Sequence, residues 1–254
     1  MTNLKKIARG LAFAASLAGA GVGAGLGPAH AEGRTINVAT DATFMPFEFQ
    51  QDGKMTGFDV ELVEALAKKM GDTVKWTQID FKGLIPGLIA KRYDMAVSAI
   101  YITDARRKVV DFTNTYYPGG LVVLTKKDDT SIEGPKDLAG KKVSVQVGTK
   151  SVAYLSEHYP EAKLVEVEKN DEMFNLLKIG RVDAAVTGKP AAINYAKKNA
   201  DVKVLPQQVT TEEYGMAVRK DLPELTADLN KALEAIKADG TYDALVKKWF
   251  GDVK

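Results

Sequence analysis

The sequence of 254 residues contains no cysteine and only two histidines, His30 and His158. Without cysteine the fold cannot use disulfides, so its stability must come from a buried core. The chain is long enough to build that core as one large domain or two modest ones. So few histidines disfavour a Ser–His or Cys–His nucleophile pair and exclude a multi-histidine metal site. We therefore expect no catalytic residue, no metal and no cofactor.

The first 31 residues have the pattern of a secretory signal peptide. Three cations, Lys5, Lys6 and Arg9, precede an apolar run over 10–27, and Pro28-Ala-His-Ala31 supplies an A-x-A cleavage site. The alternative is a membrane anchor, but the run is rich in glycine and weakly hydrophobic. A lipoprotein anchor would need a cysteine. We predict that residues 1–31 are removed on export to the periplasm, which leaves His158 as the one histidine.

The charge balance gives no support to nucleic-acid binding. The whole sequence has 35 cationic and 33 acidic side chains. Cleavage after residue 31 removes three cations and no acid, which leaves 32 against 33 and a net charge of about −1. Proteins that bind nucleic acid usually present a clear excess of positive charge. We therefore expect no nucleic-acid partner.

Strands and helices alternate along the rest of the chain, which is typical of α/β folds with parallel βαβ units. Strands are predicted at 35–40, 73–79, 94–100, 121–125, 142–147, 163–167, 182–186 and 213–218. Helices are predicted at 57–70, 83–90, 151–155, 171–179, 191–198, 222–238 and 242–249. The two halves have a similar order of elements, but no convincing residue-level repeat.

This order predicts two α/β lobes. Residues 32–115 and 215–254 form a discontinuous first lobe, and residues 121–209 form the second. The chain would cross between lobes twice, at about 116–120 and 210–214, and two such crossings can act as a hinge.

Thr103-Asp104 is a helix N-cap signature after an apolar run, and it places Arg106 in the first helical turn. Backbone N–H groups there have no intrahelical partner, and together with a guanidinium they suit a carboxylate. The alternative is an ordinary capped helix with a solvated arginine.

Several segments in a shared order resemble the type 3 periplasmic solute-binding proteins, the polar amino-acid receptors of ABC importers, with glutamine-binding proteins as the nearest subgroup. The segments are Ala39–Phe49, Gly57–Leu62, Asp80–Pro86, Ile102–Arg106, Asp111-Phe, Tyr116-Tyr, Val147–Thr149, Asp183-Ala-Ala, Gly240-Thr-Tyr and Lys248–Gly251. The resemblance covers 35–251 and implies a two-lobed periplasmic-binding-protein fold.

The resemblance also implies roles for residues of the first lobe. Arg106 corresponds to the arginine that holds the ligand's α-carboxylate by a bidentate contact. Phe44 and Phe81 correspond to two aromatic rings that enclose the ligand side chain, with plain core burial as the alternative. Asp41 corresponds to an acid that recognises the side-chain end or amide of the ligand, with a turn or helix cap as the alternative.

In the second lobe, Thr149 and Lys150 correspond to a strand-to-helix turn whose N–H groups face the ligand. Gln146 stands where glutamine-binding proteins carry a lysine. Gly188 stands where the family usually has an acid for the ligand ammonium, although glycine also suits a turn before Pro190.

The family's G/S-M-T-I-T stretch also differs here. Tyr101 replaces a threonine that accepts from the ligand ammonium, and Ala99 replaces a glycine. A buried ammonium without a carboxylate is costly. Either Asp41 supplies the countercharge, or the ligand has no free α-ammonium. The predicted ligand-binding residues are Asp41, Phe44, Phe81, Ser98, Ala99, Tyr101, Arg106, Gln146, Thr149, Lys150, Thr187 and Gly188.

The resemblance implies a monomeric receptor that captures a polar amino acid, with glutamine as the first candidate, and delivers it to a membrane permease. One alternative is a receptor for an opine or dicarboxylate that lacks a free α-ammonium. Another is a lyase on the same fold, similar to cyclohexadienyl dehydratases, but Gly188 removes the most obvious general acid. A sensory domain is less favoured, since no membrane span or output segment follows the last predicted helix.

Overall fold

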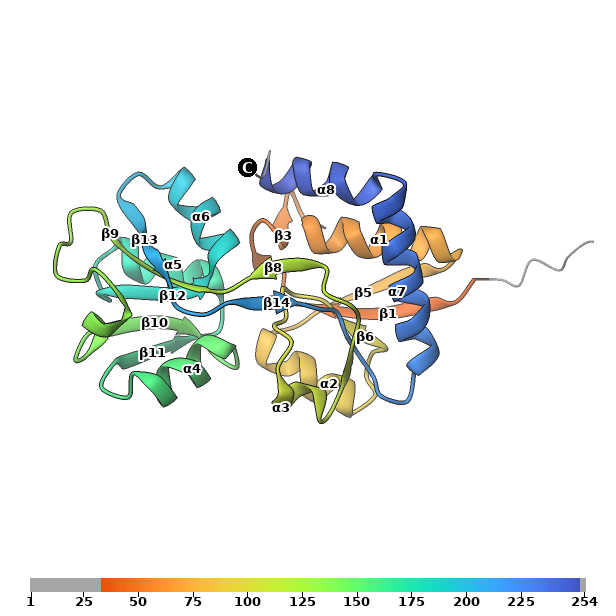
Figure 1. The fold of residues 1–254 in the computed structure, drawn as a ribbon, viewed down its shortest axis with the longest axis horizontal. Helices are drawn as coiled ribbons and strands as arrows, with labels where there is room; N and C mark the ends of the chain where they lie inside the picture. Colours follow the sequence, from red (N-terminus) through yellow and green to blue (C-terminus); the bar gives the residue numbers. More distant parts are fainter. Residues whose placement is uncertain (1–32, 252–254) are drawn as a thin grey trace, which may run out of the picture. The chain divides into compact units, whose positions relative to one another are not determined.

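The computed structural model describes residues 33–251, which form two sheet-rich lobes with helices packed against them (Figure 1). The predicted signal peptide, residues 1–31, lies outside the described residues. Within 33–251, no helix has both the length and the apolar character needed to cross a membrane. The predicted α/β class is confirmed.

The first sheet has the strand order β5-β1-β6-β15-β7. Its strands are β1 (Thr35–Thr40), β5 (Thr73–Gln78), β6 (Met95–Ala96), β7 (Asp111–Phe112) and β15 (Ala217–Val218). The helices of this part of the chain are α1 (Phe58–Met70), α2 (Leu84–Ile89), α3 (Asp104–Arg107), α7 (Pro223–Ala238) and α8 (Thr241–Phe250), with a 3₁₀ turn η1 (Phe81–Gly83). β1 is parallel to β5 and β6, as alternating strands and helices predict, whereas β15 is antiparallel to both of its neighbours.

The second sheet has the order β11-β10-β12-β9-β13. Its strands are β9 (Leu121–Lys126), β10 (Lys142–Gln146), β11 (Lys163–Val167), β12 (Ala184–Gly188) and β13 (Val202–Gln208). Its helices are α4 (Lys150–His158), α5 (Asn170–Lys178) and α6 (Lys189–Lys198), with a 3₁₀ turn η2 (Pro135–Leu138). β10 is parallel to β11 and β12, while β9 is antiparallel to β12 and β13.

Two antiparallel strands run between the sheets (Figure 1). They are β8 (Tyr117–Gly119), which leads into β9, and β14 (Glu212–Tyr214), which leads back to β15 in the first sheet. The segments expected to act as hinges, 116–120 and 210–214, fall on this pair.

The strand predicted over 94–100 is shorter than expected, because β6 ends at Ala96. Ala99 adopts a left-handed backbone with φ 42°, which few non-glycine residues do. Its N–H donates to the Asp59 carboxylate at 2.8 Å instead of to a neighbouring strand. Apolar content alone could not reveal this, since Val97, Ala99 and Ile100 are buried as strand residues would be.

An aromatic cluster joins the segment before α1 to the last helix, α8. Phe47 packs edge-on against Phe58 of α1 and Tyr117 of β8, with ring centroids 6.2 and 5.8 Å apart, and contacts Phe250 of α8 at 5.2 Å. Phe47 and Phe58 are completely buried. Aromatic pairs in this geometry stabilise a core beyond their buried area, so the cluster fixes α1 and α8 beside the connecting strands.

A three-stranded hairpin sheet of β2 (Thr43–Phe44), β3 (Glu48–Gln51) and β4 (Lys54–Thr56) precedes α1. Gly57 joins β4 to α1 with φ 131° and ψ 174°, a region that essentially only glycine occupies. A Cβ on Gly57 would lie 2.1 Å from the carbonyl oxygen of Phe47. The hairpin and α1 therefore meet at a position that requires glycine.

Gly57→Ala should destabilise the protein by more than about 2 kcal/mol, because backbone strain and a backbone clash add. Gly53→Ala is the matched control: Gly53 also has positive φ (73°), but a Cβ there meets nothing within 4 Å. We expect the control to cost only about 1 kcal/mol. Urea unfolding of both variants measures the difference, and equal midpoints would contradict the close approach.

Candidate functional site

All the predicted ligand-binding residues except Asp41 line one cavity, of about 440 Å³ counted with the space that opens to solvent. They are Phe44, Phe81, Ser98, Ala99, Tyr101, Arg106, Gln146, Thr149, Lys150, Thr187 and Gly188. The lining also includes Glu48, Leu121, Ser151, Asn170, Val186 and Tyr214, which the sequence analysis did not select. The lining combines residues of both lobes.

Arg106 is held by neutral groups. Thr103 caps α3 and accepts from the Arg106 N–H at 3.2 Å, as the N-cap signature predicted. Its guanidinium donates to the carbonyl oxygens of Tyr101 (2.8 Å) and Gly148 (3.3 Å), and lies 5.6 Å from the centre of the Phe81 ring. Burial lowers the pKa of Arg106 to about 10, so it stays protonated at neutral pH.

No carboxylate of residues 33–251 forms an ion pair with Arg106. Glu212 attracts this guanidinium from beyond ion-pair distance, and a partly buried cation with no closer anion is unfavourable. The remaining guanidinium donors therefore favour an anion in the cavity, and a carboxylate matches the guanidinium fork.

The turn between β10 and α4 adds backbone donors. Thr149 precedes the first residue of α4, and its hydroxyl donates to the Gln146 carbonyl oxygen at 2.7 Å instead of capping the helix. The first N–H groups of α4 therefore have no side-chain cap, and Thr149, Lys150 and Ser151 all line the cavity. Free N–H groups at a helix start favour negative charge. The Lys150 ammonium, in contrast, is already paired with Glu212.

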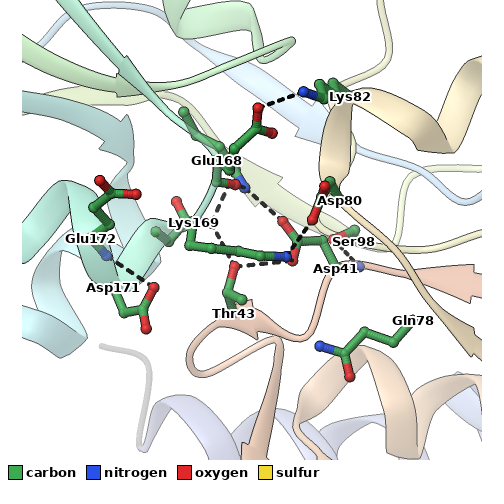
Figure 2. Close-up of polar contacts among 12 residues, drawn as sticks. Asp41, Thr43, Gln78, Asp80, Lys82, Ser98, Glu168, Lys169, Asp171 and Glu172 are labelled. Carbon is green, nitrogen blue, oxygen red and sulfur yellow. Dashed lines mark hydrogen bonds and ion pairs between the residues drawn. The ribbon is translucent and has the colours of Figure 1, made fainter.

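Asp41 does not line the cavity but joins the two lobes (Figure 2). Its carboxylate accepts from the Gln146 amide at 2.6 Å and lies 3.3 Å from the Lys169 ammonium. Lys169 also pairs with Asp80 at 2.6 Å. Burial raises the pKa of Asp41, and Lys169 opposes that rise. Asp41, which the sequence analysis offered as a partner for a ligand ammonium, is therefore already paired with Lys169.

Further contacts extend this network around Asp41. Lys82 pairs with Glu168 across the lobes (Figure 2), and Asn170 donates to the Gln146 side-chain oxygen at 3.0 Å. The hydrogen bond from Lys169 holds the pKa of Asp80 below its usual value. Polar segments from both lobes thus meet beside the cavity.

Gly188 is surrounded by aromatic side chains. Tyr101 and Tyr214 stack with ring centroids 4.6 Å apart, and their hydroxyls are 3.0 Å from each other. A Cβ on Gly188 would lie 2.4 Å from the Tyr214 hydroxyl, 3.2 Å from the Tyr101 hydroxyl and 3.3 Å from the Phe44 ring. Tyrosine hydroxyls thus occupy the space into which a larger side chain at 188 would extend.

The two differences from the family pattern, Tyr101 and Gly188, are therefore linked. The Tyr101 hydroxyl is one of the groups that occupy the space a side chain at 188 would need. Burial raises the pKa of Tyr101 to about 12, and raises that of Tyr214 well above its usual value. Both hydroxyls are neutral at neutral pH. This part of the cavity offers hydrogen bonds without a negative charge.

The residues that sequence reasoning missed had weak or ambiguous signals. Glu48 lies in the segment 39–49 that carried the resemblance, but an acid between two phenylalanines gave no role by itself. Lys169 and Asn170 follow a predicted strand, where polar side chains of α/β sheets gather, and that rule could have selected them. Tyr214 reads simply as a strand residue.

A two-lobed α/β protein with a cavity between its lobes has the architecture of a solute-binding protein. The family of bacterial extracellular solute-binding proteins, family 3, matches residues 36–252. The chain belongs to this family.

Curated relatives are amino-acid-binding proteins of ABC transporters. ABC transporter arginine-binding protein 1 of Escherichia coli (strain K12) is 38% identical over 222 residues, covering 85% of this chain and 90% of the relative. A probable histidine-binding protein of Campylobacter jejuni subsp. jejuni is 36% identical over 225 residues, covering 85% and 84%. These relatives are named as binding proteins and not as enzymes.

Solved structures similar to this chain are also of amino-acid-binding proteins. An ancestral arginine-binding protein, seen with arginine and with glutamine, is 42% identical with a TM-score of 0.82, and the alignments cover 85–86% of this chain and 98% of that one. An ancestral amino acid-binding protein described as a precursor of cyclohexadienyl dehydratase is 41% identical with a TM-score of 0.80, covering 85% and 95%.

Gly188→Ala should destabilise the protein by about 1–3 kcal/mol, because the added methyl group overpacks the site against the Tyr214 hydroxyl. Tyr214→Phe removes that hydroxyl, so the same glycine substitution should cost clearly less in the Tyr214→Phe background. A double-mutant cycle by urea unfolding measures this coupling. Additive effects would show that Tyr214 does not limit the space at 188.

Proposed function

We propose that this protein is a periplasmic receptor of an ABC importer and that it binds a polar amino acid by the ligand's α-carboxylate. The observation that carries the proposal is Arg106, a half-buried guanidinium whose hydrogen bonds go to carbonyl oxygens and which lines a cavity formed by both lobes. A ligand carboxylate would provide the missing anion. The bound solute would then be delivered to the membrane permease.

The cavity walls support an amino acid with a polar side chain. Phe44 and Phe81 line the cavity and offer apolar surface to the aliphatic part of a ligand. Gln146 and Asn170 line it as well and offer amide groups to a polar end. Glutamine and arginine are the first candidates, since the ancestral protein with the same fold is seen with each of them.

A ligand without a free α-ammonium is the second candidate, and Gly188 favours it. Glu48 is the one carboxyl among the cavity-lining residues. Burial raises its pKa well above the usual value, which disfavours a negative charge on this side chain. An opine or a dicarboxylate would need no carboxylate partner of this kind.

A thermal-shift screen separates these ligand classes. The exported chain is heated with glutamine, arginine, histidine, an opine such as octopine, or a dicarboxylate. A ligand at about 100 times its Kd stabilises the folded state by about 2.7 kcal/mol, a shift of several degrees for a chain of this size. We expect glutamine or arginine to give such a shift. A response to the opine or dicarboxylate alone would select the second candidate.

We propose binding without turnover. A lyase on this fold would need a general acid in the cavity, and Glu48 is the one lining carboxyl that could serve. Incubation with prephenate and arogenate tests this directly, and product formation that Glu48→Gln abolishes would overturn the proposal.

Arg106→Ala should weaken binding of the ligand found in the screen by about 2–5 kcal/mol, because the bound carboxylate loses its buried partner. That change moves a micromolar Kd toward the millimolar range. Arg107→Ala is the matched control, since Arg107 lies next to it on α3 and is exposed. Isothermal titration calorimetry compares the two variants. Wild-type affinity in a folded Arg106→Ala protein would refute the carboxylate site.

We also propose that β8 and β14 form the hinge and that the Asp41–Lys169–Asp80 contacts hold the lobes together. Lys169→Met removes the cation from this network, so the unliganded variant should have a larger radius of gyration than the wild type by small-angle scattering. Lys178→Met is the control, since Lys178 bonds to Asn199 within the second lobe. An unchanged radius in Lys169→Met would show that the network does not hold the lobes.

A further inference from the structure

Two acidic side chains, Glu48 of β3, which lines the cavity, and Asp59 of α1, which does not, are both completely buried. Glu48 Oε1 accepts from the Ser98 hydroxyl at 2.7 Å. Asp59 Oδ2 accepts from the Ala99 N–H at 2.8 Å and from the Tyr116 hydroxyl at 2.9 Å. One oxygen of each carboxyl is therefore well satisfied.

The other two oxygens, Glu48 Oε2 and Asp59 Oδ1, are buried and receive no donor from the described residues. The two carboxyls are close enough to act on each other, and Asp59 raises the pKa of Glu48. Two ionised carboxylates could not occupy this place, because each would repel the other with no water to screen them. One hydrogen held between the two groups would remove this repulsion.

The surrounding donors decide which carboxyl holds the hydrogen. Asp59 receives two hydrogen bonds and Glu48 one, so negative charge is better stabilised on Asp59. Burial and the neighbouring Asp59 raise the pKa of Glu48 well above its usual value, while burial raises that of Asp59 only to about 6. The hydrogen is therefore better placed on Glu48 than on Asp59.

The other titratable groups that act on the pair come from three further elements. Asp41, after β1, adds negative charge, although Lys169 partly compensates for it. Tyr116, before β8, and Tyr214 of β14 have pKa values raised by burial and are neutral. These neighbours favour retention of the proton.

We propose that Glu48 and Asp59 share one proton at neutral pH and that this acid–carboxylate pair positions Ser98 and Ala99 in the cavity wall. Both residues line the cavity next to Glu48, and Ala99 has an unfavourable left-handed backbone. The hydrogen bond from its N–H to Asp59 holds that conformation. The same segment continues to Tyr101, whose carbonyl oxygen accepts from Arg106.

Glu48→Gln is the decisive variant, because a glutamine amide donates permanently where a protonated glutamate does. A folded state that keeps its proton loses stability as pH rises, since Glu48 ionises in the unfolded chain above about pH 4.3. Glutamine has no such loss. Between pH 6 and 8 the unfolding equilibrium constant of the wild type should therefore rise about tenfold per pH unit relative to Glu48→Gln.

Urea unfolding at several pH values measures this ratio. Glu64→Gln, on the exposed face of α1, is the matched control for removal of one carboxyl. A ratio between wild type and Glu48→Gln that stays constant over this range would mean that Glu48 is ionised in the folded protein, and would overturn the shared proton.

NMR of the Ala99 amide proton provides a second readout, because that proton is bonded to Asp59. Its resonance should titrate with a midpoint near pH 6 in the wild type. The midpoint should change little in Glu48→Gln, which replaces one neutral donor by another. A downward shift of about one unit or more would show that a negative charge had been removed, which again contradicts the proposal.

The positioning role is tested by a change of side-chain chemistry at constant size. Glu48→Met keeps the volume but neither accepts from Ser98 nor donates to Asp59. The amide resonances of Ser98 and Ala99 should move in Glu48→Met and stay near their wild-type positions in Glu48→Gln. Unmoved resonances in Glu48→Met, or equal displacement in both variants, would refute positioning. If Glu48→Met does not fold, wild-type-like resonances in Glu48→Gln support positioning and displaced ones refute it.

Discussion

The half-buried guanidinium of Arg106 is the constraint on which the site depends. Its hydrogen-bond partners in the described structure are carbonyl oxygens, one from each lobe, and burial lowers its pKa without bringing it near neutrality. A charge in this position is tolerated only if something else neutralises it. The uncapped first turn of α4 faces the same cavity and also favours an anion. In the proposed function both lobes contribute to one anion-binding subsite, so that ligand binding and contact between the lobes would support each other.

The other charges around the cavity are compensated within the protein. Lys150 is paired with Glu212, and Asp41 with Lys169. The buried carboxyls Glu48 and Asp59 have their pKa values raised by burial. Internal compensation of this kind leaves Arg106 as the group that selects charge, and leaves hydroxyls, amides and aromatic rings to select shape. Ligand specificity is then a matter of which neutral groups a solute can satisfy, since an unpaired polar group in a closed site is penalised strongly.

Most of the fold could be predicted from periodicity, because apolar positions repeat at helical spacing in α1 and as short buried runs in β9 and β10. The N-cap at Thr103 likewise placed Arg106 correctly, since capping depends on local residues alone. Contacts between distant segments could not be predicted. Nothing near Asp41 in the sequence shows that Lys169 will bond to it, and nothing near Ala99 shows that Asp59 will shorten a strand. Such contacts exist only after the lobes have formed.

The structure gives a physical reason for Gly188, where the family usually has an acid. In the sequence, glycine in place of an acid looks like a missing charge that an aspartate could restore. In the structure, the stacked rings of Tyr101 and Tyr214 fill the volume beside Gly188, so even a methyl group would have to displace a hydroxyl. Gly188 therefore leaves room for the Tyr101 and Tyr214 rings. These rings form an aromatic wall, which presents two neutral hydroxyls where the family usually has a negative charge. Because a hydroxyl both donates and accepts, this wall can bond to an ammonium or to an oxygen, and it discriminates between ligands by geometry more than by charge.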